Sequence, residues 1–172
     1  MPPASTESPS SASGEKPAHA GVHFPPPFIY AGGIVIGWLL GLAWRWPITN
    51  EVASASTARL MIAALFAVAY LALFIGALSA FRHAHTTLIP NRPATAFVSA
   101  GPYRWTRNPM YVSLALLYLA VALWMNSWWV LLMLIPVLFV IQSAVIAREE
   151  RYLASAFPNE YADYCVRTRR WI

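Results

Sequence analysis

Charge is what this chain has least of. Only 11% of its 172 residues are Asp, Glu, Lys or Arg, whereas soluble domains carry roughly 25%. So few charges cannot coat a surface that faces water. The chain is also 58% hydrophobic and has a mean hydropathy of +0.50. These values exclude an ordinary soluble domain and predict an all-α integral membrane protein.

Other features are scarce as well. The single cysteine, Cys165, excludes an intrachain disulfide and leaves no metal-ligand set, so no metal site is expected. No glycine-rich loop follows a strand pattern, which excludes a soluble type of nucleotide-binding domain. The net charge of +5 does not predict a nucleic-acid partner, because the basic residues flank apolar runs instead of forming one solvated face.

The first 24 residues differ in composition from the rest. They are rich in Pro, Ser and Ala and lack the apolar run of 7–15 residues that a signal peptide needs, so a disordered tail is expected over 1–24. Residues 25–172 are expected to form one membrane domain.

Four apolar runs in this domain are each close to the ~20 residues that a helix needs to cross a bilayer. Only Asn126 and Ser127 separate the last two runs, which predicts a tight helical hairpin. Pro136 should bend the fourth helix, because it removes a backbone donor. The expected spans are residues 28–46, 60–81, 109–125 and 128–147.

Arginines set the expected orientation. Four of them lie between the second and third spans and five follow the fourth, whereas the loop between the first two spans carries Arg45 and Arg59. The positive-inside rule therefore predicts that both termini face the cytoplasm, in what we expect to be a bacterial inner membrane.

Glycines recur every four residues along the first span, at Gly33, Gly37 and Gly41. They place three positions without a side chain on one helix face, where another helix can approach closely. That helix can belong to the same chain or to a second copy in a homodimer.

Two polar clusters border the last two spans. The run from Gly101 to Tyr111 precedes the third span, and its Asn108-Pro109 pair predicts a helix start with Asn108 as the cap. Arg104 and Arg107 beside this helix N-terminus form a potential seat for an anion. The fourth helix is expected to continue past the membrane through Glu149 and Glu150, with Gln142 on the same face as Glu149, seven residues away. The two clusters are expected to form one site.

These clusters carry a family resemblance. Thr86-Thr87, Pro90, Val98, Gly101-Pro102-Tyr103-Arg104 and Arg107-Asn108-Pro109-Met110-Tyr111 resemble the membrane methyltransferases, which include the isoprenylcysteine carboxyl methyltransferases and the phospholipid methyltransferases. The closing run Glu149-Glu150, Leu153, Phe157, Tyr161, Tyr164 and Arg170-Trp171-Ile172 resembles the same superfamily. The likeness covers residues 58–172. Asn108 stands where family members often have His, so it cannot serve as a general base near neutral pH.

The resemblance implies S-adenosylmethionine as the methyl donor and S-adenosylhomocysteine as the product, bound between the last two helices and the C-terminal segment. Arginines suit the donor's carboxylate, glutamates its ammonium or ribose hydroxyls, and tyrosines its adenine or sulfonium. Arg107 and Glu150 are the expected catalytic residues. The expected cofactor-binding residues are Tyr103, Arg104, Arg107, Asn108, Pro109, Tyr111, Gln142, Glu149, Glu150, Tyr161 and Tyr164.

The acceptor stays open between a carboxylate on an isoprenylated cysteine and a phospholipid amine, and it would enter from the bilayer. Two alternatives change the chemistry. A membrane reductase of related fold would use NADPH. A non-enzymatic scaffold would tolerate Glu149→Ala and Tyr111→Ala but not Gly37→Leu.

Overall fold

The computed structural model describes residues 25–50, 53–84 and 97–172. The expected tail over 1–24 and the residues Thr86, Thr87 and Pro90 lie outside these ranges. Within them the chain is helical and has no named strand. The elements are α1 (Pro26–Ala43), α2 (Ala53–His83), the 3₁₀ helix η1 (Gly101–Arg104), α3 (Pro109–Trp124), α4 (Trp128–Val140), the π-helical turn η2 (Ile141–Ile146), α5 (Ala147–Ala156) and α6 (Pro158–Arg167).

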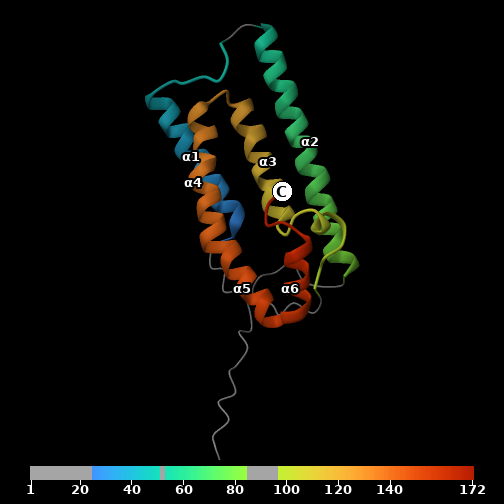
Figure 1. Ribbon diagram of the computed structural model, residues 1–172. Coiled ribbons are helices and arrows are strands. Elements are labelled where there is room, and N and C mark those ends of the chain that lie inside the picture. Colours follow the sequence, from blue (N-terminus) through green and yellow to red (C-terminus); the bar gives the residue numbers. More distant parts are fainter. Residues whose placement is uncertain (1–24, 51–52, 85–96) are drawn as a thin grey trace, which may run out of the picture.

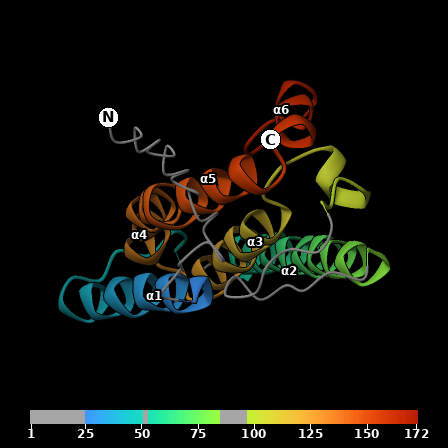
Figure 2. The same ribbon diagram turned by 90° about the horizontal axis from the view of Figure 1, so that it is seen from below.

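The four long helices lie side by side. In Figures 1 and 2, α2 runs along α3 and α1 runs along α4, while α3 and α4 meet in the middle of the bundle. The short helices α5 and α6 gather at one end, and the C-terminal segment turns back from them toward the start of α3. This arrangement brings both polar clusters to the same end.

Helix length and composition confirm an integral membrane protein of the all-α class. Three helical stretches are long and apolar enough to cross a bilayer, namely Pro26–Ala43, Ala55–His83 and Trp128–Ala156, and the fourth, α3, has 16 residues. Large apolar side chains such as Leu65 on α2, 67% exposed, point outward, as expected for helices that face lipid.

The expected boundaries of two helices need correction. The first helix begins at Pro26, since proline is tolerated in a first helical turn, and it ends at Ala43 instead of 46 because Trp44 is extended. The second begins at Ala53 instead of 60, because the sequence before Leu60 contains no glycine or proline to stop it. The hairpin at Asn126 and Ser127 is confirmed: Asn126 takes a positive φ of 53°, and the Ser127 hydroxyl accepts a hydrogen bond from Val130 N at 3.3 Å.

The glycine face of α1 packs against α4. A Cβ at Gly37 would lie 2.6 Å from Val130 Cα, and one at Gly33 would overlap Val137, whereas one at Gly41 would meet only Ser127 Oγ at 3.5 Å. Gly33 and Gly37 therefore serve close packing within the chain. Whether a second copy also pairs with α1 stays a prediction.

The fourth helix passes through Pro136 and then widens into η2. Pro136 supplies no backbone N–H, and the Ser143 hydroxyl donates to the Phe139 carbonyl at 2.7 Å. A π-helical turn holds one more residue than an α-helical turn, so it shifts the helix faces beyond it by one position. The helix then continues as α5 to Ala156, as expected from the sequence.

Candidate functional site

The 3₁₀ helix η1 brings the first polar cluster against α2. Gly101 has a φ of +60°, a conformation that glycine adopts without steric cost. Pro102 then lies so close to Gly76 of α2 that an added Cβ would meet Pro102 Cγ at 3.0 Å. Tyr103 is buried in the same contact, edge-on to Phe81 with ring centroids 5.5 Å apart. The turn that follows is thereby fixed at the start of α3.

The C-terminal segment pairs with this turn. Arg107 N donates to the Arg169 carbonyl at 2.8 Å, the Asn108 side-chain amide donates to the Arg170 carbonyl at 2.9 Å, and the Thr106 hydroxyl donates to the same carbonyl at 3.2 Å. Asn108 is the N-cap residue of α3, as expected, but the expected side-chain cap is wrong, because its buried side chain makes no capping bond and holds the Arg170 carbonyl instead. Pro109 is buried as the first residue of α3, as expected.

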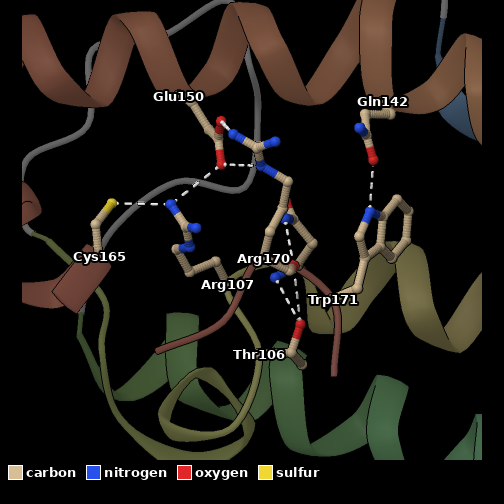
Figure 3. A network of polar contacts seen from close by, with 8 residues as sticks. Thr106, Arg107, Gln142, Glu150, Cys165, Arg170 and Trp171 are labelled. Atoms are coloured by element: carbon tan, nitrogen blue, oxygen red, sulfur yellow. Dashed lines mark hydrogen bonds and ion pairs between the residues drawn. The ribbon is translucent and has the colours of Figure 1, made fainter. Parts of the chain in front are cut away.

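One carboxylate and two arginines form the charged centre of the site. Glu150 on α5 accepts two hydrogen bonds from Arg170, at 2.9 and 2.7 Å, and lies 3.3 Å from an Arg107 nitrogen. That Arg107 nitrogen also donates to Cys165 Sγ at 2.9 Å. Figure 3 shows Glu150 reaching down from its helix between the two guanidinium groups. Two cations around one carboxylate leave an excess of positive charge, which favours an anionic ligand.

Glu149 turns to a different partner. Its carboxylate accepts a hydrogen bond of 2.6 Å from the Tyr111 hydroxyl on α3, and Tyr30 of α1 in turn donates to the Tyr111 carbonyl at 3.0 Å. The stretch Trp128–Ala156 has 29 residues, about 43 Å of helix, which exceeds the ~30 Å of hydrocarbon. Since the charged residues begin at Arg148, directly after the expected span, we expect Glu149 to lie beyond the hydrocarbon. Burial raises the pKa of Glu149 to about 7, and the nearby Glu150 contributes to this increase, while the Tyr111 hydrogen bond opposes it.

The π-helical turn changes the expected register of this helix. Glu149 follows Gln142 by seven positions, which places them on one face of a regular α-helix, but Gln142 lies within the π-helical turn η2. Gln142 accepts a hydrogen bond of 2.7 Å from Trp171 Nε1, next to the residue that pairs with Glu150. Gln142 and Glu150 therefore point to the same segment, as Figure 3 shows. Gln142 and Glu149, which were expected to share a face, contact different parts of the chain, the C-terminal segment and α3.

Two tyrosines of α6 form an aromatic wall beside Arg107. Tyr161 and Tyr164 are buried, and Phe97 lies edge-on to both, with ring centroids 6.2 and 5.1 Å away. The Tyr164 hydroxyl donates to the Tyr103 carbonyl at 2.6 Å. Burial raises the pKa of Tyr161 and of Tyr164 above the ordinary tyrosine range, so both remain neutral phenols.

The site therefore gathers most of the residues expected from the sequence, with one outlier. Arg104 is exposed and makes no contact with the charged centre among the described residues. A role for it in ligand binding stays a prediction, as do the functional roles of the others.

Four contributors were not expected from the sequence. Thr106, Cys165, Arg170 and Trp171 each take part in the network (Figure 3). Arg170 and Trp171 belong to the closing run of the family resemblance. A cation and an indole directly after an amphipathic helix could have indicated that they take part in the site. Neither Thr106 nor Cys165 has such a signal, because their roles depend on the pairing of segments about sixty residues apart.

An apolar groove of about 460 Å³ leads away from this network between α3 and α4. Leu116 and Leu119 form one side, Leu138 and Phe139 form the other, and Gln142 and Trp171 lie at its polar end. The candidate site thus has a charged part and a hydrocarbon part that meet at Trp171.

Comparison with known proteins agrees with this arrangement. Residues 58–160 match the phospholipid methyltransferase family, and the chain belongs to that family. It is therefore a membrane methyltransferase, within the wider superfamily that includes the isoprenylcysteine carboxyl methyltransferases.

Two curated proteins are similar over shorter stretches. An uncharacterized protein of Haemophilus influenzae is 44% identical over 63 residues, which are 37% of this chain and the whole of that protein. The cobalt-zinc-cadmium resistance protein CzcN of Cupriavidus metallidurans is 39% identical over 80 residues, 46% of this chain and 37% of that protein. No solved structure matches.

Proposed function

We propose that this protein transfers a methyl group from S-adenosylmethionine to a lipophilic acceptor that enters from the bilayer. The observation that carries the proposal is that Arg107 and Tyr111, at the start of α3, contact Glu150 and Glu149 of α5. The apolar groove begins beside them, at Gln142 and Trp171. A water-soluble acceptor would not need such a groove.

The residues present suit this methyl donor. Arg107 Nε is buried without a hydrogen-bond partner among the described residues, so its N–H group is available to bind the carboxylate of S-adenosylmethionine. Glu149 suits the ammonium or the ribose hydroxyls, and the faces of Tyr161 and Tyr164 suit adenine or a sulfonium cation. Each charged or polar part of S-adenosylmethionine therefore has a partner of matching chemistry in this site.

The chemistry that the bound donor supplies is a sulfonium methyl group ready for displacement. The contribution of the chain is to hold the reactants in line and to exclude water. A carboxylate acceptor needs no base. An amine acceptor must lose a proton first, and Glu149, with its pKa raised to about 7 by burial, is suited to accept that proton near neutral pH.

Two acceptor classes remain candidates. The family description favours an amine on a phospholipid headgroup, and the wider superfamily also contains enzymes that methylate an isoprenylcysteine carboxylate. Transfer of radiolabelled methyl to ethanolamine phospholipid or to a prenylated cysteine analogue, each in bilayer nanodiscs, would distinguish them.

The donor is tested by calorimetric titration of S-adenosylhomocysteine into the detergent-purified protein. Micromolar binding is expected for the wild type, with loss in Arg107→Ala and Glu149→Ala. Arg151→Ala is the matched control, because Arg151 is an exposed arginine on the same helix as Glu149 whose side chain donates to the Ala147 carbonyl. A folded wild type that does not bind would refute the proposal, and NADPH would be titrated next.

We also propose that the site faces the cytoplasm of a bacterium, which the distribution of arginines supports. Both cysteine variants are made in a Cys165→Ser background, because the native Cys165 thiol is free and only partly buried. Val166→Cys on α6, at a position 88% exposed, should react with a membrane-impermeant maleimide only in inverted membrane vesicles. Arg45→Cys, beyond the end of α1, should react only in right-side-out vesicles. The reverse pattern would contradict this orientation.

A further inference from the structure

The thiol of Cys165 lies at the charged centre of the site. Its Sγ accepts a hydrogen bond of 2.9 Å from an Arg107 nitrogen, and the same nitrogen lies 3.3 Å from Glu150 Oε1. Figure 3 shows the sulfur pointing toward the guanidinium group that Glu150 also contacts. Cys165 is partly exposed, so it is not sealed in the core. The chain has one cysteine, so no second thiol of the same chain can react with it.

Two buried donors beside this thiol have no hydrogen-bond partner among the described residues, namely Arg107 Nε and the Tyr161 hydroxyl. Tyr161 is 7% exposed and precedes Cys165 by four positions on α6, so the two side chains share a helix face. Burial raises the pKa of the Tyr161 phenol, and Cys165 and Arg107 shift that pKa in opposite directions, so both lie close to the hydroxyl. Because buried polar groups are nearly always hydrogen-bonded, these donors indicate an acceptor that is present only part of the time.

An oxygen atom attached to the Cys165 sulfur would be such an acceptor. Thiol sulfur accepts hydrogen bonds only weakly, whereas oxygen accepts them well. Cysteines that peroxides oxidise are typically partly exposed and lie beside cationic groups. Cys165 meets both conditions, since it contacts Arg107 at a centre where two arginines share one carboxylate.

We propose that Cys165 is a site of reversible oxidation by hydrogen peroxide, and that this oxidation weakens binding of the methyl donor by engaging Arg107. The sulfur attacks one peroxide oxygen, so that an S–O bond forms while the O–O bond breaks. The thiol and hydrogen peroxide become a sulfenic acid and water, and the two electrons that the sulfur loses pass to the peroxide. The new oxygen accepts hydrogen bonds from Arg107 Nε and the Tyr161 hydroxyl.

The effect on donor binding rests on the proposed function, whereas the oxidation itself does not. Arg107 is the residue assigned to the carboxylate of S-adenosylmethionine. A sulfenic acid that uses the same N–H group therefore competes with the donor. Reduction by two thiol groups returns the Cys165 thiol and releases water and a disulfide of the reductant, so the competition is reversible.

The oxidation is tested by trapping the sulfenic acid. Detergent-purified protein is treated with hydrogen peroxide and then with dimedone, which forms a stable adduct with a sulfenic acid, and the tryptic peptide of residues 152–167 is measured by mass spectrometry. The wild type should carry the adduct at Cys165, and dithiothreitol added before dimedone should prevent it. Absence of the adduct would overturn the proposal, and so would a disulfide-linked dimer formed in its place.

The role of Tyr161 is tested by the rate at which dithiothreitol reduces the sulfenic acid. Tyr161→Phe keeps the ring and removes the hydroxyl, so reduction should be about 2- to 12-fold faster, as expected for the loss of one hydrogen bond. Tyr70→Phe is the matched control, because it makes the same change on α2, where the ring packs on Phe74, and it should keep the wild-type rate. Equal rates in Tyr161→Phe and the wild type would overturn the assignment of this hydroxyl.

The effect on the donor is tested by calorimetric titration of S-adenosylhomocysteine into untreated, oxidised and re-reduced protein. Oxidation should weaken binding about tenfold or more, as expected when a hydrogen bond to a charged group is lost, and reduction should restore it. Peroxide should leave the affinity of Cys165→Ala at its own untreated value, which separates Cys165 from the five methionines. An equal loss in Cys165→Ala, or no loss in a wild type oxidised at Cys165, would overturn the effect on binding.

Trapping and reduction need no methyl donor, so the two proposals can fail separately. Absent binding of S-adenosylhomocysteine by an untreated, folded wild type would refute the donor and the competition with it. The adduct at Cys165 and the reduction rate of Tyr161→Phe would still decide whether the thiol is the site of oxidation.

Discussion

Replacing Gly37 by alanine should destabilise this protein, although alanine favours helices more than glycine does. The new Cβ would lie 2.6 Å from Val130 Cα and 2.9 Å from Val130 N. Carbon atoms pack best at about 3.5–4.0 Å, so α1 must move about 1 Å away from α4. Because the obstructing atoms are backbone, no side chain can rotate away, and we expect the upper part of the usual overpacking cost, about 2–3 kcal/mol.

A loss of that size should lower the midpoint of thermal unfolding by about 4–12 °C for a chain of this length. The assay is tryptophan fluorescence of the detergent-purified variants, heated at one scan rate because unfolding of membrane proteins is often irreversible. Gly32→Ala is the control: it adds the same methyl group to the same helix but meets nothing within 4 Å. Gly33→Ala should fall between the two, since it meets the flexible Val137 side chain. If Gly37→Ala and Gly32→Ala unfold at the same temperature, the close packing of α1 on α4 at Gly37 is refuted.

Three further predictions concern the site. Burial raises the pKa of Glu149 to about 7, so its ionised fraction rises about tenfold between pH 6 and pH 8. The affinity for S-adenosylhomocysteine should rise by a similar factor over this range. The same pH dependence of affinity in Glu149→Gln would contradict this prediction. Asn108→Leu removes the hydrogen bond from the Asn108 side-chain amide to the Arg170 carbonyl, which is worth about 0.5–1.5 kcal/mol. The C-terminal segment should loosen, so trypsin should cleave after Arg167 about 2- to 12-fold faster. An unchanged cleavage rate would argue against that hydrogen bond. Glu150→Gln and Arg170→Ala should show a coupling free energy of about 0.5–1.5 kcal/mol in unfolding experiments that shrinks as salt is raised, because Arg170 is 44% exposed; additive effects would exclude the pair.

The membrane fold could be predicted because the rules behind it are local. Apolar length predicts spans, and a two-residue gap at Asn126 and Ser127 permits only a hairpin. The boundaries were less accurate, because the ends of α1 and α2 depend on backbone choices near Trp44 and Ala53 that hydropathy does not report.

The site was predictable only in part, for a physical reason. Arg107 and Tyr111 lie near the start of the third apolar run, and Glu149 and Glu150 follow the end of the fourth, so a hairpin brings them to one face of the membrane. The pairing of Thr106 with Arg169 in a parallel bridge links segments 63 positions apart, and no periodic pattern announces it. Asn108 illustrates the consequence: asparagine is a common capping residue, but here its side chain binds the Arg170 carbonyl instead.

Helix geometry gives the two adjacent glutamates different partners, and the π-helical turn aligns Gln142 with one of them. Consecutive residues on a helix point about 100° apart. Glu149 therefore reaches Tyr111 on α3, while Glu150 reaches the C-terminal segment. The extra residue in η2 then brings Gln142 into line with Glu150, so that a single helix contacts Arg170 and Trp171 at two points about two turns apart. In a helix without η2, Gln142 would align with Glu149, Trp171 would lose its hydrogen-bond acceptor, and the groove would no longer end at the charged centre.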